Sequence, residues 1–380
     1  MTSPAAMTRL GRQRPARAPA GVSARAMRLL DAMHRWTGGL IGLVLLVMAV
    51  TGTILLHQDS WIMVPHARDA PVSDPARLGA AVTRMMRADG PAPQSIVLAG
   101  EGLGLHQIRY AHGRGAYADQ SGKVVTRWSS EWQRPEVWLF DLHHHLLSGA
   151  IGETVIGVAA LCGIFFVLSG TILWWRTRRT LAPRLLPRRL SRSAIVRHHR
   201  DLGILVAPLL LLSFLTGAIM VFRPLAIVFG PGTPAAIALA NRPPAAIEAG
   251  MARGLDWSGI MRVAADRFPR AQIRVLTLPS GRSKLVALRL RQPNDWVENG
   301  RTRMWFSPAT GGLVAVRDAR GLPAGVAAYD LMYPLHAAHV GGWAYRLVMT
   351  LSGAGLSLLG SLAVWSFWFR RPRRTRSQPG

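Results

Sequence analysis

Four long apolar runs constrain this chain more than any other feature of its sequence. They occupy roughly residues 38–57, 151–175, 203–222 and 343–369. Each provides about the 20 residues that an α-helix needs to cross the ~30 Å hydrocarbon core of a bilayer. The sequence therefore predicts four membrane-crossing helices.

Basic residues are distributed unevenly between these runs. Residues 1–35 carry seven Lys or Arg and one acid, residues 176–200 carry nine and no acid, and the tail from 370 carries five. Residues 58–142, in contrast, hold nine basic and nine acidic residues. Because short loops rich in Lys and Arg stay in the cytoplasm, we expect both termini there, and the two long loops outside a bacterial inner membrane. The net charge of +27 thus indicates membrane topology rather than nucleic-acid binding.

The chain also repeats itself. A gapless alignment of the first and third apolar runs pairs His34 with His199, Arg35 with Arg200, Gly38 with Gly203 and Thr51-Gly52 with Thr216-Gly217. A second gapless alignment, of the other two runs, pairs His143 with His336 and Gly149 with Gly342. Two copies of a helix, an outer module and a second helix, with the same orientation, imply a pseudo-twofold axis along the membrane normal. The expected fold class is a membrane α-helical protein, with a four-helix bundle made from a duplicated two-helix unit.

Each long loop is expected to fold into a small α+β module. Helical spacing at 74–88 and 258–268 is followed by short alternating stretches at 95–99, 105–110, 116–118 and 123–128, and at 272–278, 285–291, 304–306 and 313–317. A Gly/Pro/Ala linker is expected over residues 230–244. The predicted divisions are a disordered basic tail (1–30), a first span (31–57), a first module (58–142), a second span (143–176), a basic loop (177–197), a third span (198–223), a second module (224–335), a fourth span (336–369) and a basic tail (370–380).

Nine of the twelve histidines lie at helix ends. Residues related by the repeat lie at equal depth on opposite sides of the axis, so His34 should face His199, and His143 should face His336. Two imidazoles opposed across an apolar bundle are a typical axial ligand set for haem b. The sequence therefore predicts two haem b groups, whose iron ligands are these four histidines, and an electron path across the membrane.

Other roles for the histidines remain open. In the run His143-His144-His145 the register favours His143, with His144 next, and His198 and His339 are further candidates for the cofactor site. Because His336 and His339 share a helix face, a different metal such as zinc is an alternative, and purely structural histidines are another. His57 has no repeat partner. His66, His106 and His112 are expected at the surface.

Two neighbouring arginines and one cysteine complete the list of candidates. Arg35 and Arg200 lie beside the predicted ligands and could pair with haem propionates, or simply with lipid phosphate. Cys162 is the only cysteine, so the chain can form neither an internal disulfide nor a thiolate cluster, and redox chemistry would need another group. We find no Walker loop, dinucleotide fingerprint or catalytic triad spacing.

Three motifs resemble the PepSY-associated transmembrane family. They are His34-Arg-Trp-Thr-Gly-Gly with Thr51-Gly52, Asp141-Leu-His143 to Gly149 with Leu173-Trp-Trp-Arg, and Pro334-Leu-His336 to Gly342. The resemblance covers about residues 28–370. It implies four helices, two periplasmic PepSY modules, and an activity found in the family: two b haems that reduce ferric siderophores. Since no flavin or nicotinamide domain is recognisable, it also implies an external electron donor, a quinol or a cytosolic reductase.

The expected function is therefore reduction of periplasmic ferric complexes, as a ferric siderophore reductase in iron acquisition. Residues 223–342 carry fifteen basic and seven acidic residues, and this net positive charge would steer an anionic chelate toward the outer haem. Two alternatives remain: a non-enzymatic, membrane-anchored PepSY binding or regulatory protein, and a cytochrome b subunit of a larger oxidoreductase.

Overall fold

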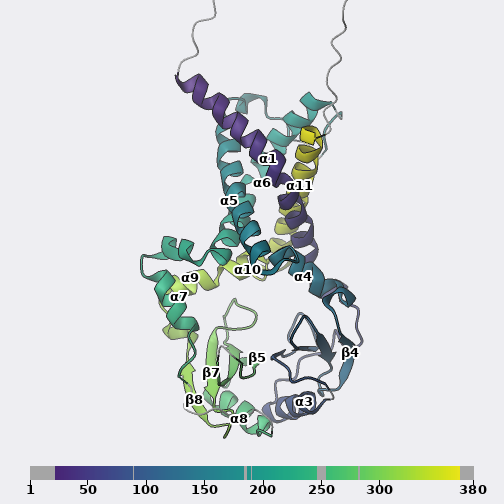
Figure 1. The fold of residues 1–380 in the computed structure, drawn as a ribbon, viewed down its shortest axis with the longest axis vertical. Coiled ribbons are helices and arrows are strands. Elements are labelled where there is room, and N and C mark those ends of the chain that lie inside the picture. The colour runs from purple at the N-terminus through teal and green to yellow at the C-terminus, as the bar shows by residue number, and fades with distance from the viewer. Residues whose placement is uncertain are drawn as a thin grey trace, which may run out of the picture.

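Four long helices form a stalk at one end of the molecule, and a wider body built on a β-sheet lies at the other end (Figure 1). The computed structural model describes residues 22–88, 90–183, 186–189, 191–245, 254–280 and 283–368. The stalk helices are α1 (Val22–Leu55), α5 (Gly149–Trp175), α6 (Arg192–Val221) and α11 (Gly342–Trp368). All four are long and apolar enough to cross a membrane, as the sequence predicts.

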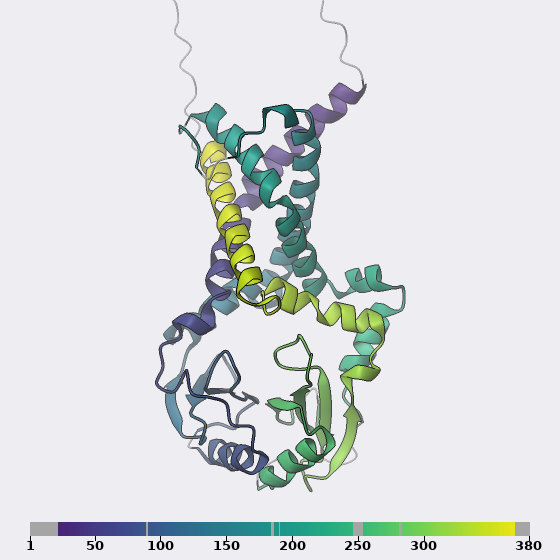
Figure 2. The same cartoon turned by 180° about the vertical axis from the view of Figure 1, so that it is seen from behind.

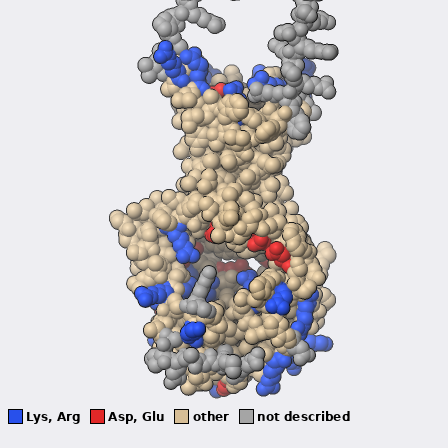
Figure 3. Space-filling model, viewed as in Figure 1, with Lys and Arg blue, Asp and Glu red and all other residues tan. Residues whose placement is uncertain are grey.

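The stalk is a bundle in which α1 and α6 each pack against both α5 and α11. Its core contains Leu45, Ala159, Leu210, Phe214 and Leu359. The outer surface of the stalk is apolar as well: among the described residues on the face seen in Figure 3, its middle shows no Lys, Arg, Asp or Glu. A helix bundle that is apolar inside and outside is suited to lipid rather than to water.

Two of the spans begin later than predicted. His143 lies in α4 (Pro135–His145) and His336 in α10 (Met332–His336), short helices that precede α5 and α11. The links between them adopt left-handed backbone in both halves, at Leu146 (φ 46°), Leu147 (φ 56°) and Gly149 (φ 57°), and at Ala338 (φ 51°), Gly341 (φ 69°) and Gly342 (φ 62°). The predicted continuous helices over 143–176 and 336–369 are therefore wrong at their starts, because the chain turns before it enters the stalk.

At the opposite end of the stalk, α1 and α6 are longer than predicted. Residues 22–30 were expected to be disordered but form the first turns of α1, and α6 begins at Arg192 rather than at 198. Residues 22–30 are rich in Ala, Arg, Met and Leu, which favour helix. Residues 1–21 and 369–380, which include most of the two predicted tails, lie outside the described residues.

Each of the two long loops contains a unit in which a helix is followed by four strands. In the first these are α3 (Pro75–Arg87), β1 (Ser95–Val97), β2 (His106–Arg109), β3 (Gly115–Ala118) and β4 (Val124–Trp128), and in the second α8 (Trp257–Arg267), β5 (Gln272–Thr277), β6 (Val286–Arg291), β7 (Thr302–Phe306) and β8 (Leu313–Arg317). Both helices start with the same cap: Asp74 accepts from the Arg77 N–H at 2.7 Å, and Asp256 from the Gly259 N–H at 2.9 Å.

The strands of both halves join into one antiparallel sheet of order β4-β3-β2-β1-β5-β6-β7-β8. The join is made by β1 and β5, where Ile96 lies opposite Leu276. Helices α3 and α8 pack against each other and share one core with the sheet, which includes Val82, Met261 and Leu288. The sequence predicted two separate sheets, and this junction corrects that expectation.

Shorter elements connect the stalk to the body, as seen from behind in Figure 2. They are α2 (Gln58–Trp61), η1 (Glu131–Gln133), η3 (Arg223–Phe229), α7 (Thr233–Asn241), η4 (Ala319–Gly321) and α9 (Ala324–Asp330). One further short element, η2 (Arg178–Thr180), lies between α5 and α6 at the other end of the stalk. Helix α7 lies inside the predicted linker, where its Ala-rich sequence outweighs the flanking Gly and Pro. His106 is also corrected: it is fully buried, whereas His66 and His112 are exposed as expected.

Candidate functional site

The structure brings four histidines together as two pairs, one near each end of the stalk. In the tail-side pair the ring centroids of His34 and His199 lie 6.4 Å apart. In the sheet-side pair those of His143 and His336 lie 6.2 Å apart. The 17 residue steps from His34 to Thr51 rise about 25 Å along α1, and Thr51 contacts His143. The two pairs therefore lie at clearly different depths.

Both separations fit one iron between two imidazoles. A metal–nitrogen bond of about 2 Å on each side, plus the distance from each nitrogen to its ring centre, places the two centroids about 6 Å apart. The rings of the tail-side pair are nearly perpendicular, at 85°, whereas those of the sheet-side pair are inclined by 48°. The donor sets therefore match bis-imidazole ligation, with a different ring geometry at each end.

In the tail-side pair the imidazoles come from the stalk helices themselves. His34 of α1 shares a hydrogen bond between its Nδ1 and Ser169 Oγ of α5, at 2.8 Å. The edge of the same ring meets Phe166, with centroids 5.4 Å apart. His199 comes from α6, so the two rings and their contacts involve three helices.

In the sheet-side pair the imidazoles reach the stalk from the short helices α4 and α10. His143 Nδ1 lies 2.9 Å from Thr51 Oγ1, and His336 Nδ1 lies 3.0 Å from Thr216 Oγ1. Burial lowers the pKa of His143 to about 3, with a further contribution from His336, and burial also lowers the pKa of His336. Both rings are therefore neutral at physiological pH, which is the form that ligates a metal.

A pocket of about 670 Å³ is lined in part by residues close to His336 in the sequence. Its walls come from the β6–β7 loop and from the segment that joins α10 to α11: Arg291, Asn294, Asp295, Trp296, Leu335, His339, Val340, Gly341 and Tyr345. Leu335 and His339 flank His336 in sequence. Figure 3 shows the molecule hollowed between stalk and body, with charged side chains of both signs around the opening.

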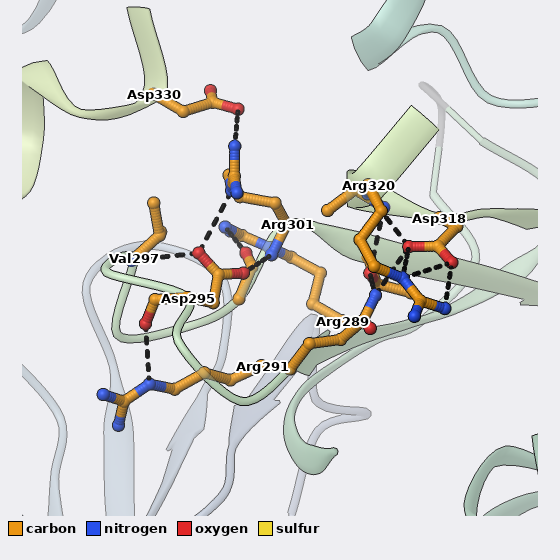
Figure 4. Close-up of polar contacts among 12 residues, drawn as sticks. Arg289, Arg291, Asp295, Val297, Arg301, Asp318, Arg320 and Asp330 are labelled. Atoms are coloured by element: carbon orange, nitrogen blue, oxygen red, sulfur yellow. Dashed lines mark hydrogen bonds and ion pairs between the residues drawn. The ribbon is translucent and has the colours of Figure 1, made fainter. Parts of the chain in front are cut away.

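The β6–β7 loop that forms one wall of this pocket is held by a buried carboxylate. Asp295 accepts hydrogen bonds from the Val297 N–H at 3.2 Å and from Arg301 Nε at 3.0 Å (Figure 4). Arg301 in turn lies 4.0 Å from Asp330 of α9. Because these contacts tie the loop to α9, the pocket wall keeps a defined position beside α10.

A comparison with known families covers nearly the whole chain. The model of the PepSY-associated TM region matches residues 32–371, which include all four histidines of the two pairs. The chain belongs to this family. Among curated proteins, none matches it significantly. Together with its four candidate spans, membership makes the chain a multi-pass membrane protein.

In this PepSY-associated protein the other candidate histidines are not part of the pairs. His144 stacks on Phe140, with centroids 4.0 Å apart, and His145 Nδ1 lies 2.8 Å from Asp141. The triplet therefore diverges, as consecutive helical residues must. His339 Nδ1 lies 3.2 Å from Glu298, and His198 is buried beside its neighbour His199.

The alternative of a zinc site finds no support in the described part of the chain. There, no group of three or more His, Cys, Asp or Glu could hold a metal ion. Of the two arginines, Arg200 lies 2.6 Å from Asp201 and also donates to Thr180, whereas Arg35 is exposed. Arg200 is thus already engaged by protein groups, and Arg35 is the more accessible of the two.

Sequence reasoning missed the function of the repeated Thr-Gly dipeptides. Thr51 and Thr216 contact the two sheet-side imidazoles, and the glycines after them lie against the same rings: a Cβ on Gly52 would be 2.8 Å from His143 Cε1, and one on Gly217 would be 3.5 Å from His336 Cε1. The exact repeat of this dipeptide at equal register was the signal available in the sequence.

Proposed function

We propose that this chain is an inner-membrane electron-transfer protein that binds two b haems and reduces ferric complexes, such as ferric siderophores, on the periplasmic side. The observation that supports this best is the presence of two histidine pairs at different depths, each with the centroid separation that bis-imidazole ligation requires. A protein that merely anchors an outer domain has no need of opposed imidazoles at two depths.

On this proposal, His34 and His199 hold one haem, and His143 and His336 hold the other. A bound haem supplies reversible one-electron transfer. The apolar stalk around the pairs excludes water, and the hydrogen bonds at Nδ1 hold the rings in place. The basic end of the stalk faces the cytoplasm and receives electrons from an external donor, a quinol or a cytosolic reductase.

The pocket beside His336 is the place where a ferric chelate would approach the sheet-side haem. It offers the guanidinium of Arg291 and the half-exposed indole of Trp296, which suit an anionic or aromatic chelate. Because siderophores bind ferric iron far more tightly than ferrous iron, delivery of one electron releases the metal and leaves the chelator intact. The two helix-and-strand units around this pocket are then the PepSY modules.

The first test is an absorption spectrum of the purified protein in detergent, before and after dithionite. We expect a low-spin b-type spectrum with two haems per chain by the pyridine haemochrome method. A folded but colourless protein would contradict the proposal, and would favour a membrane-anchored binding protein.

The second test adds a ferric hydroxamate chelate anaerobically to the reduced protein, with a ferrous trap present. We expect haem reoxidation and ferrous release in equal amounts. The Arg291→Gln variant should need about tenfold more chelate for the half-maximal rate, if it loses about 1.4 kcal/mol of charge-assisted binding, while its haem spectrum is unchanged. Haem that stays reduced would instead indicate a cytochrome subunit whose partner carries the substrate chemistry.

A further inference from the structure

Three of the four paired imidazoles make the same kind of contact at Nδ1. Each faces the hydroxyl of a residue on a different helix: His143 faces Thr51 at 2.9 Å, His336 faces Thr216 at 3.0 Å and His34 faces Ser169 at 2.8 Å. His336 Nδ1 also lies 3.1 Å from the Ser213 carbonyl oxygen, so a backbone group assists the hydroxyl at that ring. The two ends of the stalk therefore share one contact type.

The direction of these hydrogen bonds follows from a second contact of each hydroxyl. Thr51 donates to the Val47 carbonyl at 2.8 Å, Thr216 to the Leu212 carbonyl at 2.8 Å, and Ser169 to the Phe165 carbonyl at 2.6 Å. Because a carbonyl only accepts, the proton of each hydroxyl is used there, and the hydroxyl oxygen accepts from the imidazole Nδ1–H. The proton thus lies on Nδ1, and the lone pair of Nε2 is left for a metal.

A glycine follows each of these hydroxyl residues. A Cβ on Gly52 would lie 2.8 Å from His143 Cε1, one on Gly170 would lie 3.4 Å from His34 Cε1, and one on Gly217 would lie 3.5 Å from His336 Cε1. The same ring atom faces the glycine in all three cases. The hydroxyl therefore holds the imidazole at Nδ1, and the glycine leaves room for the adjacent ring edge.

The dipeptide Ser169-Gly170 does not arise from the sequence repeat. The alignment of His143 with His336 places Leu362-Ala363 opposite Ser169-Gly170, so α11 lacks a copy. Ser169-Gly170 thus lies beside a tail-side ring although the other half of the chain has no matching dipeptide. A hydroxyl residue followed by glycine is therefore associated with the imidazoles and not only with the duplication.

We propose that Thr51-Gly52, Ser169-Gly170 and Thr216-Gly217 are positioning dipeptides, which fix the Nδ1–H tautomer and the ring plane of the haem-ligating histidines. This inference rests on the proposed function, since it assigns these residues a role toward the haems. Partners at the second ring nitrogen raise the basicity of a ligating imidazole, and their loss typically weakens metal affinity about 10- to 100-fold.

The test compares Thr51→Val, Thr216→Val and Ser169→Ala with two matched controls. Thr53→Val removes a hydroxyl that bonds the Ala49 carbonyl at 2.6 Å on the same helix as Thr51, and Thr171→Val removes one that bonds the Val167 carbonyl at 2.7 Å on the same helix as Ser169. Neither control hydroxyl has a histidine among its hydrogen-bond partners in the described chain.

Three readouts report on the haem itself rather than on activity. They are the rate of haem transfer to apomyoglobin, the low-spin electron paramagnetic resonance signal of each oxidised haem, and its midpoint potential. For the sheet-side haem, Thr51→Val should speed transfer about 10- to 100-fold and raise the potential, because the imidazole becomes a weaker donor. Thr216→Val should act in the same direction but less, because the Ser213 carbonyl still accepts from His336 Nδ1. Ser169→Ala should do the same for the tail-side haem, and both controls should match the wild type.

A glycine variant tests the second half of each dipeptide. Gly52→Ala places a methyl group against His143 and should perturb the sheet-side signal, although Ala favours helix more than Gly does. Gly203→Ala is its control, because a Cβ there meets nothing within 4 Å. Wild-type protein without haem overturns the proposed function and this inference together. Two normal haems in the wild type, with all three hydroxyl variants unchanged in every readout, overturn the inference alone.

Discussion

The two histidine pairs differ in how the protein holds them. The rings of His34 and His199 belong to α1 and α6, so bundle packing alone sets their positions. The rings of His143 and His336 belong to the short helices α4 and α10. Segments with left-handed backbone separate these helices from the stalk helices α5 and α11. The body also holds α4, since the Tyr117 hydroxyl of β3 donates to Glu136 at 3.0 Å. The tail-side pair therefore depends on the bundle, whereas the sheet-side pair depends on both stalk and body.

The largest effects are expected from the histidines themselves. His34→Ala or His199→Ala should remove the tail-side haem alone, and His143→Ala or His336→Ala the sheet-side haem alone, because each change deletes one of two axial ligands. Haem content per chain should fall by half in each case.

A histidine outside the pairs is the control for this experiment. His57 Nε2 lies 2.8 Å from Thr350, and His57→Ala should keep both haems. If His144→Ala lost a haem while His143→Ala kept both, the ligand within the triplet would be His144 instead.

The next effect should come from the link between β3 and α4. Glu136 is buried and pairs with Arg134 at 2.6 Å, so Glu136→Leu leaves a guanidinium without its partner. We expect a loss of about 3 kcal/mol in stability, and a loosened sheet-side haem beside an unchanged tail-side haem. Thermal unfolding with both haem spectra measures this, and Glu153→Gln, an exposed change on α5, should have no effect. Equal loss of both haems would show that the two ends are not independent.

A smaller effect is expected where α5 passes under the end of α4. A Cβ on Gly152 would clash with the His145 carbonyl oxygen, so Gly152→Ala must shift the backbone that carries His143. Overpacking of this kind costs about 1–3 kcal/mol of stability. The electron paramagnetic resonance signal of the sheet-side haem should change, whereas that of the tail-side haem should not. Gly38→Ala on α1, where a Cβ meets nothing within 4 Å, provides the tail-side comparison.

The smallest effect should be a gain in stability. Leu147 is more than one-third exposed and has φ 56°, a conformation that costs a non-glycine residue about 1–2 kcal/mol. Leu147→Gly should therefore raise the unfolding midpoint by a few degrees without altering the tail-side haem. A Leu-to-Gly change at Leu161, a partly exposed position inside α5, should lower the free energy of unfolding by about 1 kcal/mol. A fall in both variants would mean that the Leu147 side chain matters more than its backbone.

Much of this architecture follows from sequence periodicity. Run length predicted the spans, and the repeat predicted the meeting of His143 with His336, because equal register in duplicated helices means equal depth. Side-chain spacing could not predict the breaks before α5 and α11, since Leu146 and Leu147 are not residues that usually adopt positive φ.

Contacts between distant segments were equally hard to predict. The alternation of β1 shows a strand but not its partner, so its pairing with β5 was missed. His106 looked like a surface residue, yet its Nδ1 accepts from the Ala99 N–H at 3.0 Å within the fold. The hydroxyl groups of Thr51 and Ser169 meet histidines on other helices, and helical spacing carries no information about such meetings.

The seam between β1 and β5 joins strands that occupy the same place in their respective halves, running in opposite directions. A twofold axis through the sheet produces this arrangement, as at an isologous dimer interface. Either half alone would leave that strand edge, together with the open sides of two helices, without a partner. A half on its own could cover these surfaces only against a second copy of itself, so this single chain has the internal symmetry of a dimer.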